Sequence, residues 1–294
     1  MSYAIIECES RKIFKNISIE EVFDEVHIKI PKFKNKKSQK YAKKINKILK
    51  KHKVSNVVLS NELMENEVFK NVIYMQNNYI ITGNKLYQSL LRKVLEDICS
   101  IVEVPLQTVS VEILCNEFSI ENLDLVKYIS QSVKQVTIMS ENKEKFENIA
   151  LELMSEAGIP LTVLENKTRT SAIGRTNFII NVDYGEEEIK KLIIPKDAIV
   201  ISVRKKITEL RKNFNGIIIN DLNIYLGKEI QNFRTLALCE AYVYDYKRRN
   251  QENEKKFERS EYKINAYIGN NGIISEEEFK KIGKTFVKKS KNNT

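Results

Sequence analysis

With 294 residues the chain can form one large domain or two of ordinary size, and 42% hydrophobic residues exclude an intrinsically disordered protein. The 49 basic and 39 acidic residues give a formal net charge of +10. No apolar run approaches the roughly 18 residues that cross a bilayer, and the early acidic residues argue against a secretory signal. We therefore expect a cytoplasmic protein without a transmembrane segment.

Histidine and cysteine usage narrows the chemistry further. Only His27 and His52 are present, which argues against a histidine-based metal site and against a Ser-His-Asp triad. The four cysteines are scattered without a CxxC pair, and Cys99 and Cys115 lie in apolar stretches, so buried free thiols are expected. We predict no metal site and assign no catalytic residue.

The first third of the sequence alternates short strands and helices. Runs of β-branched residues predict strands, and apolar residues at helical spacing predict helices. Ser38 is the expected cap of the first helix, and Gly83 breaks the chain before the third. The expected strands cover residues 3–7, 26–30 and 54–59, and the expected helices cover residues 39–52, 65–75 and 85–102.

After Pro105 strands of about five residues alternate with connections of helix length, which indicates parallel β-α-β crossovers. Gly158 is expected to close a helix, residues 247–263 to form an exposed extension or linker, and Ser275 with Glu278 to form a capping box for a last short helix. The basic tail from Lys284 is expected to fray. The expected strands cover residues 109–114, 135–139, 161–164, 177–182, 198–203 and 216–220, and the expected helices cover residues 121–132, 143–156, 207–213 and 229–247.

The pattern of residues 109–203 resembles the Rossmann-like domain of the shikimate and amino-acid dehydrogenase families. A second strand ends in the turn Ser140-Glu141-Asn142-Lys143, and Thr176-Asn177-Phe178-Ile179-Ile180-Asn181 matches the strand that precedes a cofactor-contacting turn in those enzymes. The resemblance covers about a third of the chain and implies NAD or NADP as cofactor. The cofactor-binding residues it implies are Asn116, Glu141, Asn142 and Asn181.

We therefore predict an α/β fold, with a doubly wound, mostly parallel Rossmann-like sheet preceded by a smaller α/β domain. The expected domains are an N-terminal α/β domain with a lysine-rich helix in residues 1–105, a Rossmann-like domain in residues 106–250 and a charged C-terminal extension in residues 251–294.

The first β-α turn departs from the families that it resembles. A dinucleotide site needs glycines there, so that the backbone can approach the pyrophosphate. This turn reads Cys115-Asn116-Glu117-Phe118-Ser119-Ile120, and no glycine lies between Asn84 and Ala157. Glu117 would also place a carboxylate where a diphosphate binds. We expect the ordinary dinucleotide mode to be lost.

Glu141 favours the opposite interpretation. It lies about 25 residues beyond the first turn, where an acidic residue binds the ribose hydroxyls in the families that the chain resembles. The alternative is that Glu141 and Asn142 simply open a helix N-terminus.

Polar residues gather at the expected carboxyl ends of the strands, the edge along which open α/β sheets bind ligands. Polar loops account for much of this pattern without any function. The residues are Asn116, Glu117, Ser140, Glu141, Glu165, Asn166, Asn181, Asp183, Arg204, Asn220 and Asp221.

Residues 32–53 carry eleven lysines and no acidic residue. On the expected helix from Gln39, lysines that include Lys43, Lys44, Lys47 and Lys50 lie opposite its apolar side and could bind nucleic acid, another acidic partner or an anionic membrane. A solvated helix face is the plainer interpretation, since heavy use of Lys, Asn and Ile is typical of AT-rich bacterial genomes.

These observations predict a non-catalytic Rossmann-like protein with a binding, regulatory or scaffolding role and no cofactor. We expect it to have a protein partner or to form an oligomer, and the sequence does not identify which. The alternative is an NAD(P)-dependent oxidoreductase with an altered cofactor mode. Nucleic-acid binding through the lysine-rich helix is a further alternative.

Overall fold

A computed structural model describes residues 3–9, 16–22, 25–165, 176–225, 232–249 and 262–291. It divides into two compact units, of which one comprises Met1–Leu86 with Asn223–Ile264 and the other Tyr87–Leu222 with Asn265–Thr294. Contacts therefore divide the chain differently from the predicted boundaries at residues 105 and 250. After residue 222 the chain returns to the first unit, because the apolar side of the helix over residues 235–249 packs there. The segment Asn265–Thr294 belongs to the second unit.

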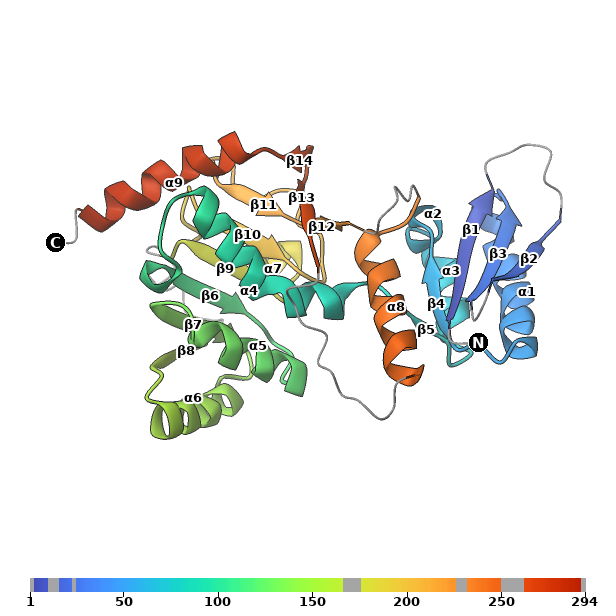
Figure 1. The fold of residues 1–294 in the computed structure, drawn as a ribbon, viewed down its shortest axis with the longest axis horizontal. Coiled ribbons are helices and arrows are strands. Elements are labelled where there is room, and N and C mark those ends of the chain that lie inside the picture. Colours follow the sequence, from blue (N-terminus) through green and yellow to red (C-terminus); the bar gives the residue numbers. More distant parts are fainter. Residues whose placement is uncertain are drawn as a thin grey trace. The chain divides into compact units, whose positions relative to one another are not determined.

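The first unit is built on a five-stranded sheet in the order β2-β3-β1-β4-β5 (Figure 1). All neighbouring pairs are parallel except β2 with β3, which run antiparallel along one edge. The strands are β1 (Tyr3–Glu9), β2 (Ser18–Val22), β3 (Glu25–Pro31), β4 (Asn56–Leu59) and β5 (Tyr79–Ile80).

Both faces of this sheet are covered. Val57 belongs to a buried cluster with α1 (Ser38–Lys51) and α3 (Glu67–Tyr74), whereas the next residue, Val58, belongs to a second cluster with α8 (Thr235–Arg249). Successive side chains of a strand point to opposite faces, so the two clusters lie on opposite sides of the sheet.

The predicted elements of this unit are confirmed with two strands missed, β2 and β5. The helix predicted over residues 65–75 is confirmed as α3, which starts after Asn66 because the Asn66 side chain accepts a hydrogen bond from the Phe69 N–H. The short helix α2 (Asn61–Met64) that precedes it was also missed. Ser38 is wrong as a cap. It is the first residue of α1 and is buried, and its hydroxyl accepts a hydrogen bond from the Asn66 side chain at 2.9 Å.

The second unit is built on six parallel strands in the order β11-β10-β9-β6-β7-β8 (Figure 1). Counted within this sheet from the β8 edge, the strands follow the chain as 3-2-1-4-5-6, the order of a dinucleotide-binding Rossmann sheet. The predicted fold class is thereby confirmed. The strands are β6 (Ser110–Leu114), β7 (Gln135–Ser140), β8 (Leu161–Glu165), β9 (Phe178–Asn181), β10 (Ile199–Ser202) and β11 (Ile217–Ile219).

The centre of this sheet is buried on both sides. Ile113 of β6 lies between Ile138 of β7 and Ile180 of β9, and all three are fully buried. The neighbouring Leu114 belongs to a cluster on the other face. The helices of this unit are α4 (Asn84–Ile101), which begins in the first unit, α5 (Ile120–Ser130), α6 (Lys143–Ala157), α7 (Glu186–Ile189) and α9 (Glu276–Lys291).

A small sheet in the order β12-β13-β14 leads into the last helix. The capping box is confirmed, because Ser275 and Glu278 exchange backbone and side-chain hydrogen bonds at the start of α9. The last helix is longer than predicted, since α9 continues to Lys291. The strands are β12 (Asp221–Ile224), β13 (Ile264–Gly269) and β14 (Gly272–Ile274), and two short 3₁₀ turns occur at Asn35–Lys37 and Leu106–Thr108.

The helix predicted over residues 207–213 is wrong. The Asn220 side chain accepts from the Ile207 N–H at 2.8 Å and donates to the Ile207 carbonyl at 3.0 Å, so these backbone groups are satisfied without a helix. The predicted helix over residues 229–247 begins at Thr235 among the described residues. Most of the predicted linker, residues 250–261, and the expected connection at residues 168–174 lie outside the described ranges. Over the described ranges no helix is long and apolar enough to cross a membrane.

Candidate functional site

The candidate site lies where the strand order of the second sheet reverses. All six strands are parallel, so their carboxyl ends share one edge, and open α/β sheets bind ligands at the reversal point on that edge. Here this point lies between β6 and its neighbour β9. The turn after β6 leads into α5, whose N-cap is Ser119, and the turn after β9 contains Asp183.

Asp183 bonds the backbone of the turn after β6. Its carboxylate accepts hydrogen bonds from the Asn116 N–H, at 2.9 Å to Oδ1 and 3.1 Å to Oδ2, and from the Glu117 N–H at 2.7 Å to Oδ2. In a dinucleotide-binding Rossmann domain the backbone of this turn approaches the pyrophosphate. The anion that these two N–H groups bind here is the protein's own carboxylate.

The side chain of Glu117 is also paired. It forms an ion pair with Arg204, which follows β10, and the Glu117 carbonyl accepts a hydrogen bond from the Asn122 side chain at 2.7 Å. Asn122 is buried in α5 and in turn accepts from Gln88 of α4 at 2.9 Å. The turn is therefore held from its own helix and from β10.

Three of the four predicted cofactor residues lie together. The Asn116 side chain accepts from the Glu141 N–H at 2.9 Å, and the Asn142 side chain donates to the Asn116 carbonyl at 2.6 Å. These contacts join the turns after β6 and β7. Glu141 itself is exposed at the carboxyl end of β7.

Asn181, the fourth predicted cofactor residue, is fully buried, and its side chain bonds groups inside the protein. Its side chain donates to the Tyr184 carbonyl at 3.0 Å and to the Ser202 hydroxyl at 2.9 Å, and accepts from the Tyr184 N–H at 2.9 Å. It holds the turn that presents Asp183 and uses both its amide nitrogen and its oxygen to do so.

The buried titratable groups of this unit are held protonated. Burial raises the pKa of Cys99 to about 12 and that of Glu112, in the middle of β6, to about 8, and the Thr176 side chain lowers the latter by a smaller amount. Burial also raises the pKa values of Cys115 and Tyr184. Burial therefore disfavours the charged forms of these groups, which are their nucleophilic and basic forms. Within the described part of the chain, no group of three His, Cys, Asp or Glu side chains could hold a metal ion.

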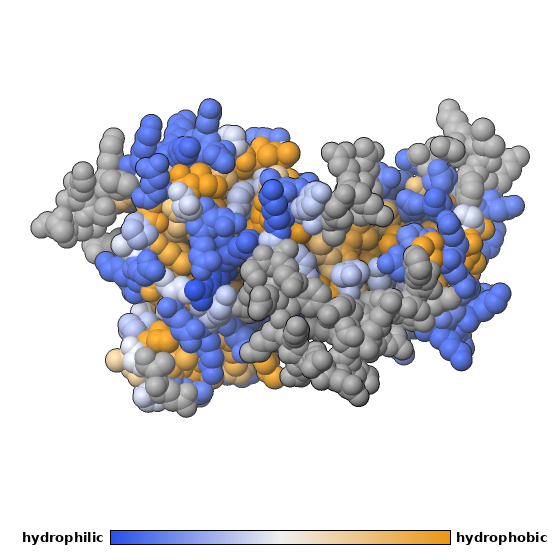
Figure 2. All heavy atoms as spheres, in the orientation of Figure 1, coloured by the Kyte–Doolittle hydropathy of each residue, from blue (hydrophilic) through white to orange (hydrophobic). Residues whose placement is uncertain are grey.

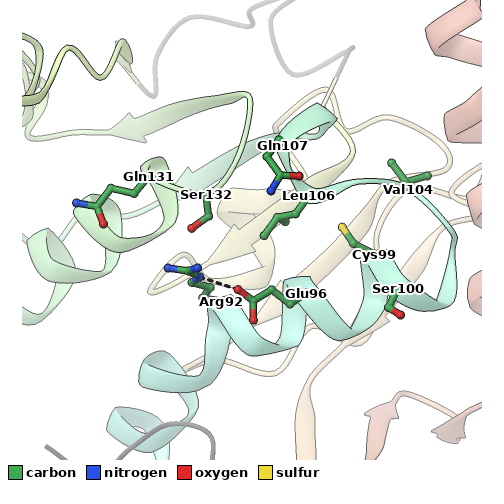
Figure 3. Close-up of a pocket in the computed structure, with 9 residues that line it drawn as sticks. All are labelled: Arg92, Glu96, Cys99, Ser100, Val104, Leu106, Gln107, Gln131 and Ser132. Carbon is green, nitrogen blue, oxygen red and sulfur yellow. Dashed lines mark hydrogen bonds and ion pairs between the residues drawn. The ribbon is translucent and has the colours of Figure 1, made fainter.

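A polar cavity of about 370 Å³ lies near the amino ends of the strands, at the other edge of the sheet (Figure 3). Leu106 precedes β6 and Ser132 precedes β7, and both line it with residues of α4. Its charged groups satisfy each other, because the Arg92 Nε donates to Glu96 at 2.7 Å and the guanidinium lies over the Tyr128 ring at 4.7 Å. The cavity therefore belongs to neither of the predicted sites.

The second predicted site is on α1, in the first unit. Lys43, Lys44, Lys47 and Lys50 are all exposed, as the amphipathic pattern predicts.

No family model matches the chain and no curated protein sequence does. Among solved structures, L-tryptophan dehydrogenase from Nostoc punctiforme matches with 10% identity over 91% of this chain and 77% of that chain, at a TM-score of 0.39. Quinate dehydrogenase from Corynebacterium glutamicum, solved with NAD, matches with 7% identity over 69% of this chain and 79% of that chain, at a TM-score of 0.31. Glutamyl-tRNA reductase from Methanopyrus kandleri matches with 9% identity over 86% of this chain and 56% of that chain, at a TM-score of 0.29.

Two of these matches are dehydrogenases. At TM-scores below 0.5 the likeness carries no argument about function. The fold class follows from the strand order itself.

Sequence reasoning placed Asp183 and Arg204 among the polar residues of the edge without giving either a role. The ion pair of Arg204 could have been found from its charge, which is opposite to that of Glu117. The contact of Asp183 could have been found from its place at the end of a strand, since its carboxylate can bind the backbone of a turn that lacks the usual glycines.

Proposed function

We propose that this chain is a non-catalytic Rossmann-like protein with a binding role, in which Asp183 takes the position of the diphosphate in the first β-α turn and no dinucleotide cofactor binds there. The observation that carries the proposal is the acceptance of two backbone N–H groups by the Asp183 carboxylate.

Electrostatics oppose a second anion at this turn. Two unit charges 4 Å apart repel by about 1 kcal/mol in bulk water and about 4 kcal/mol at the effective dielectric of a protein surface. The larger value lowers an affinity by about three orders of magnitude. The neighbouring cation, Arg204, reduces this repulsion only in part, because its charge is already paired with that of Glu117.

The chemistry of the surrounding groups also favours binding over catalysis. The cysteine and tyrosine nearest the turn, Cys115 and Tyr184, are buried with raised pKa values. Glu141 and Asn142 are exposed beside the turn, where the Glu141 carboxylate and the Asn142 amide oxygen can accept hydrogen bonds from hydroxyl, amide or amine groups.

One observation favours an NAD(P)-dependent oxidoreductase with an altered cofactor mode as a second candidate. Glu141 is exposed at the end of β7, its backbone is fixed by Asn116, and this is where an acidic residue binds ribose hydroxyls in Rossmann enzymes. In that case the dinucleotide would bind through its ribose while its diphosphate avoided the turn after β6.

Calorimetric titration with NADH and NADPH separates the two candidates. We expect no micromolar binding by the wild-type protein. Micromolar binding that is lost in Glu141→Ala and kept in Glu144→Ala, an exposed glutamate in the first turn of α6, would replace the proposal by the second candidate.

A further inference from the structure

Helix α1 separates lysine from apolar side chains completely. Ala42, Ile45 and Leu49 are at most 1% exposed and belong to the core of the first unit. The lysine face on the opposite side consists of six exposed residues, Lys40, Lys43, Lys44, Lys47, Lys50 and Lys51. Figure 2 shows hydrophilic residues over the outer side of this helix, at the right of the view.

The lysine face has no acidic counterpart. The chain has 39 acidic residues, yet none falls between Lys32 and Lys53, so a general excess of lysine does not explain the segregation. Among the ion pairs of described residues, Lys32 pairs with Glu62 at 3.3 Å, but no lysine of the face takes part in one. Lysines three and four positions apart repel one another, and this repulsion is relieved when an anion binds.

The geometry of the face fits an extended polyanion. From Lys40 to Lys51 the helix rises about 16 Å, a length over which one strand of a duplex carries about five phosphates. Tyr41 is half-buried at the border of the face, with the Lys44 ammonium 5.9 Å from its ring centre and Phe33 stacked on it at 4.7 Å. Cations beside an aromatic ring are the combination with which proteins bind nucleic-acid strands.

An anionic membrane fits less well. A helix that lies in a membrane surface inserts its apolar side among the lipids, whereas the apolar side of α1 is already in the protein core.

The lysine face contains no arginine that could recognise base edges through paired hydrogen bonds, so we expect contacts with phosphate groups rather than with particular bases.

We propose that the lysine face of α1 binds the phosphate backbone of nucleic acid without sequence specificity. This site is in the first unit and is independent of the function proposed for the second sheet.

The test is fluorescence anisotropy with a labelled single-stranded DNA and with the same sequence as a duplex, titrated over a range of salt concentrations. We expect affinity that falls steeply with salt for at least one form. Reversal of Lys43, Lys44, Lys47 and Lys50 to Glu should weaken binding at least tenfold and reduce the slope of log affinity against log salt by about 0.7 to 0.9 per lysine in contact. The neutral Gln variant at the same positions should show an intermediate loss.

The matched control reverses Lys212, Lys280, Lys281 and Lys284, four exposed lysines of the second unit, and so makes the same change in total charge. It should keep most of the affinity. Each variant is accepted only with an unchanged circular dichroism spectrum. Absence of salt-dependent binding by the wild-type protein, an equal loss in the control variant, or binding to phosphatidylserine vesicles without binding to either DNA would overturn the proposal.

Discussion

Asp183 and Asn116 are joined across the reversal point of the second sheet, because the Asp183 carboxylate accepts the Asn116 backbone N–H at 2.9 Å. The two residues are far apart in the sequence but follow neighbouring parallel strands, β9 and β6. A hydrogen bond from a backbone N–H to a charged acceptor is stronger than one to a neutral acceptor. The turn that binds a cofactor in related folds is therefore stabilised here by a residue of the same chain.

Asp183→Asn should destabilise the protein by about 1–2 kcal/mol. The amide keeps one acceptor oxygen, but its NH₂ group then faces one of two backbone donors, and the charge is lost. Urea unfolding would measure the change. Asp124→Asn, at an exposed position of α5, should leave the midpoint unchanged, and an equally small effect at both positions would contradict the role of Asp183.

Ile113→Ala should lower the free energy of unfolding by about 2–5 kcal/mol, through lost burial and a residual cavity. The sequence predicts a strand of a parallel sheet over residues 109–114, and the structure confirms it as β6, which lies between β7 and β9 and is buried on both faces. Ile120→Ala is the same substitution at a residue that is 76% exposed, and its unfolding midpoint should stay close to that of the wild type. A midpoint for Ile113→Ala within error of that control would be incompatible with the sheet described.

Much of the fold follows from local patterns, and the exceptions have physical causes. Parallel strands in this region were predictable because a run such as residues 109–115 ends in apolar residues on both faces, at Ile113, Leu114 and Cys115. The false helix at residues 207–213 arose because Ile207 and Leu210 have helical spacing, while the group that satisfies the backbone there is the side chain of Asn220.

The candidate site was predictable only in part. Neighbouring strand ends brought Asn116, Glu141 and Asn142 together, as their positions implied. The contact of Asp183 with the turn after β6 could not be derived, since it depends on β9 pairing with β6, which a crossover from β8 must first bring about. The return of α8 to the first unit was hidden for the same reason, because an amphipathic helix does not indicate which sheet it covers.

Glu112 should make stability depend on pH. Its pKa is about 8 in the folded protein against 4.5 for an ordinary glutamate, so between these values the folded state holds a proton that the unfolded state has lost. The contribution of Glu112 to the free energy of unfolding should therefore be largest below pH 4.5 and fall as the pH rises towards 8, by at most about 4–5 kcal/mol.

Urea unfolding of wild type and Glu112→Gln at pH 5 and pH 8 isolates this effect. Glu240, whose pKa is also raised by burial, is present in both proteins and cancels in the comparison. The fall in stability should be smaller in the variant. Equal falls in the two proteins would show that Glu112 does not titrate as described.

Gly83→Ala should destabilise the first unit by several kcal/mol. Gly83 has φ of +84°, and a Cβ there would lie 2.6 Å from the Ala237 nitrogen and 2.6 Å from the Leu236 Cβ, so backbone would have to move. Gly158→Ala is the matched control, with φ of +65° but no atom within 4 Å, and should cost only about 1–2 kcal/mol. Similar melting temperatures for the two variants would refute the close packing of α8 at Gly83.

The measurement closest to the central claim is hydrogen exchange at the Asn116 and Glu117 amides, followed by NMR with and without millimolar NADH. We expect both amides to be protected in the free protein, to lose protection in Asp183→Ala, and to be unaffected by NADH in the wild type. Amides that exchange freely in the wild-type protein and become protected only when NADH is added would contradict the claim that Asp183 occupies the anion position of this turn.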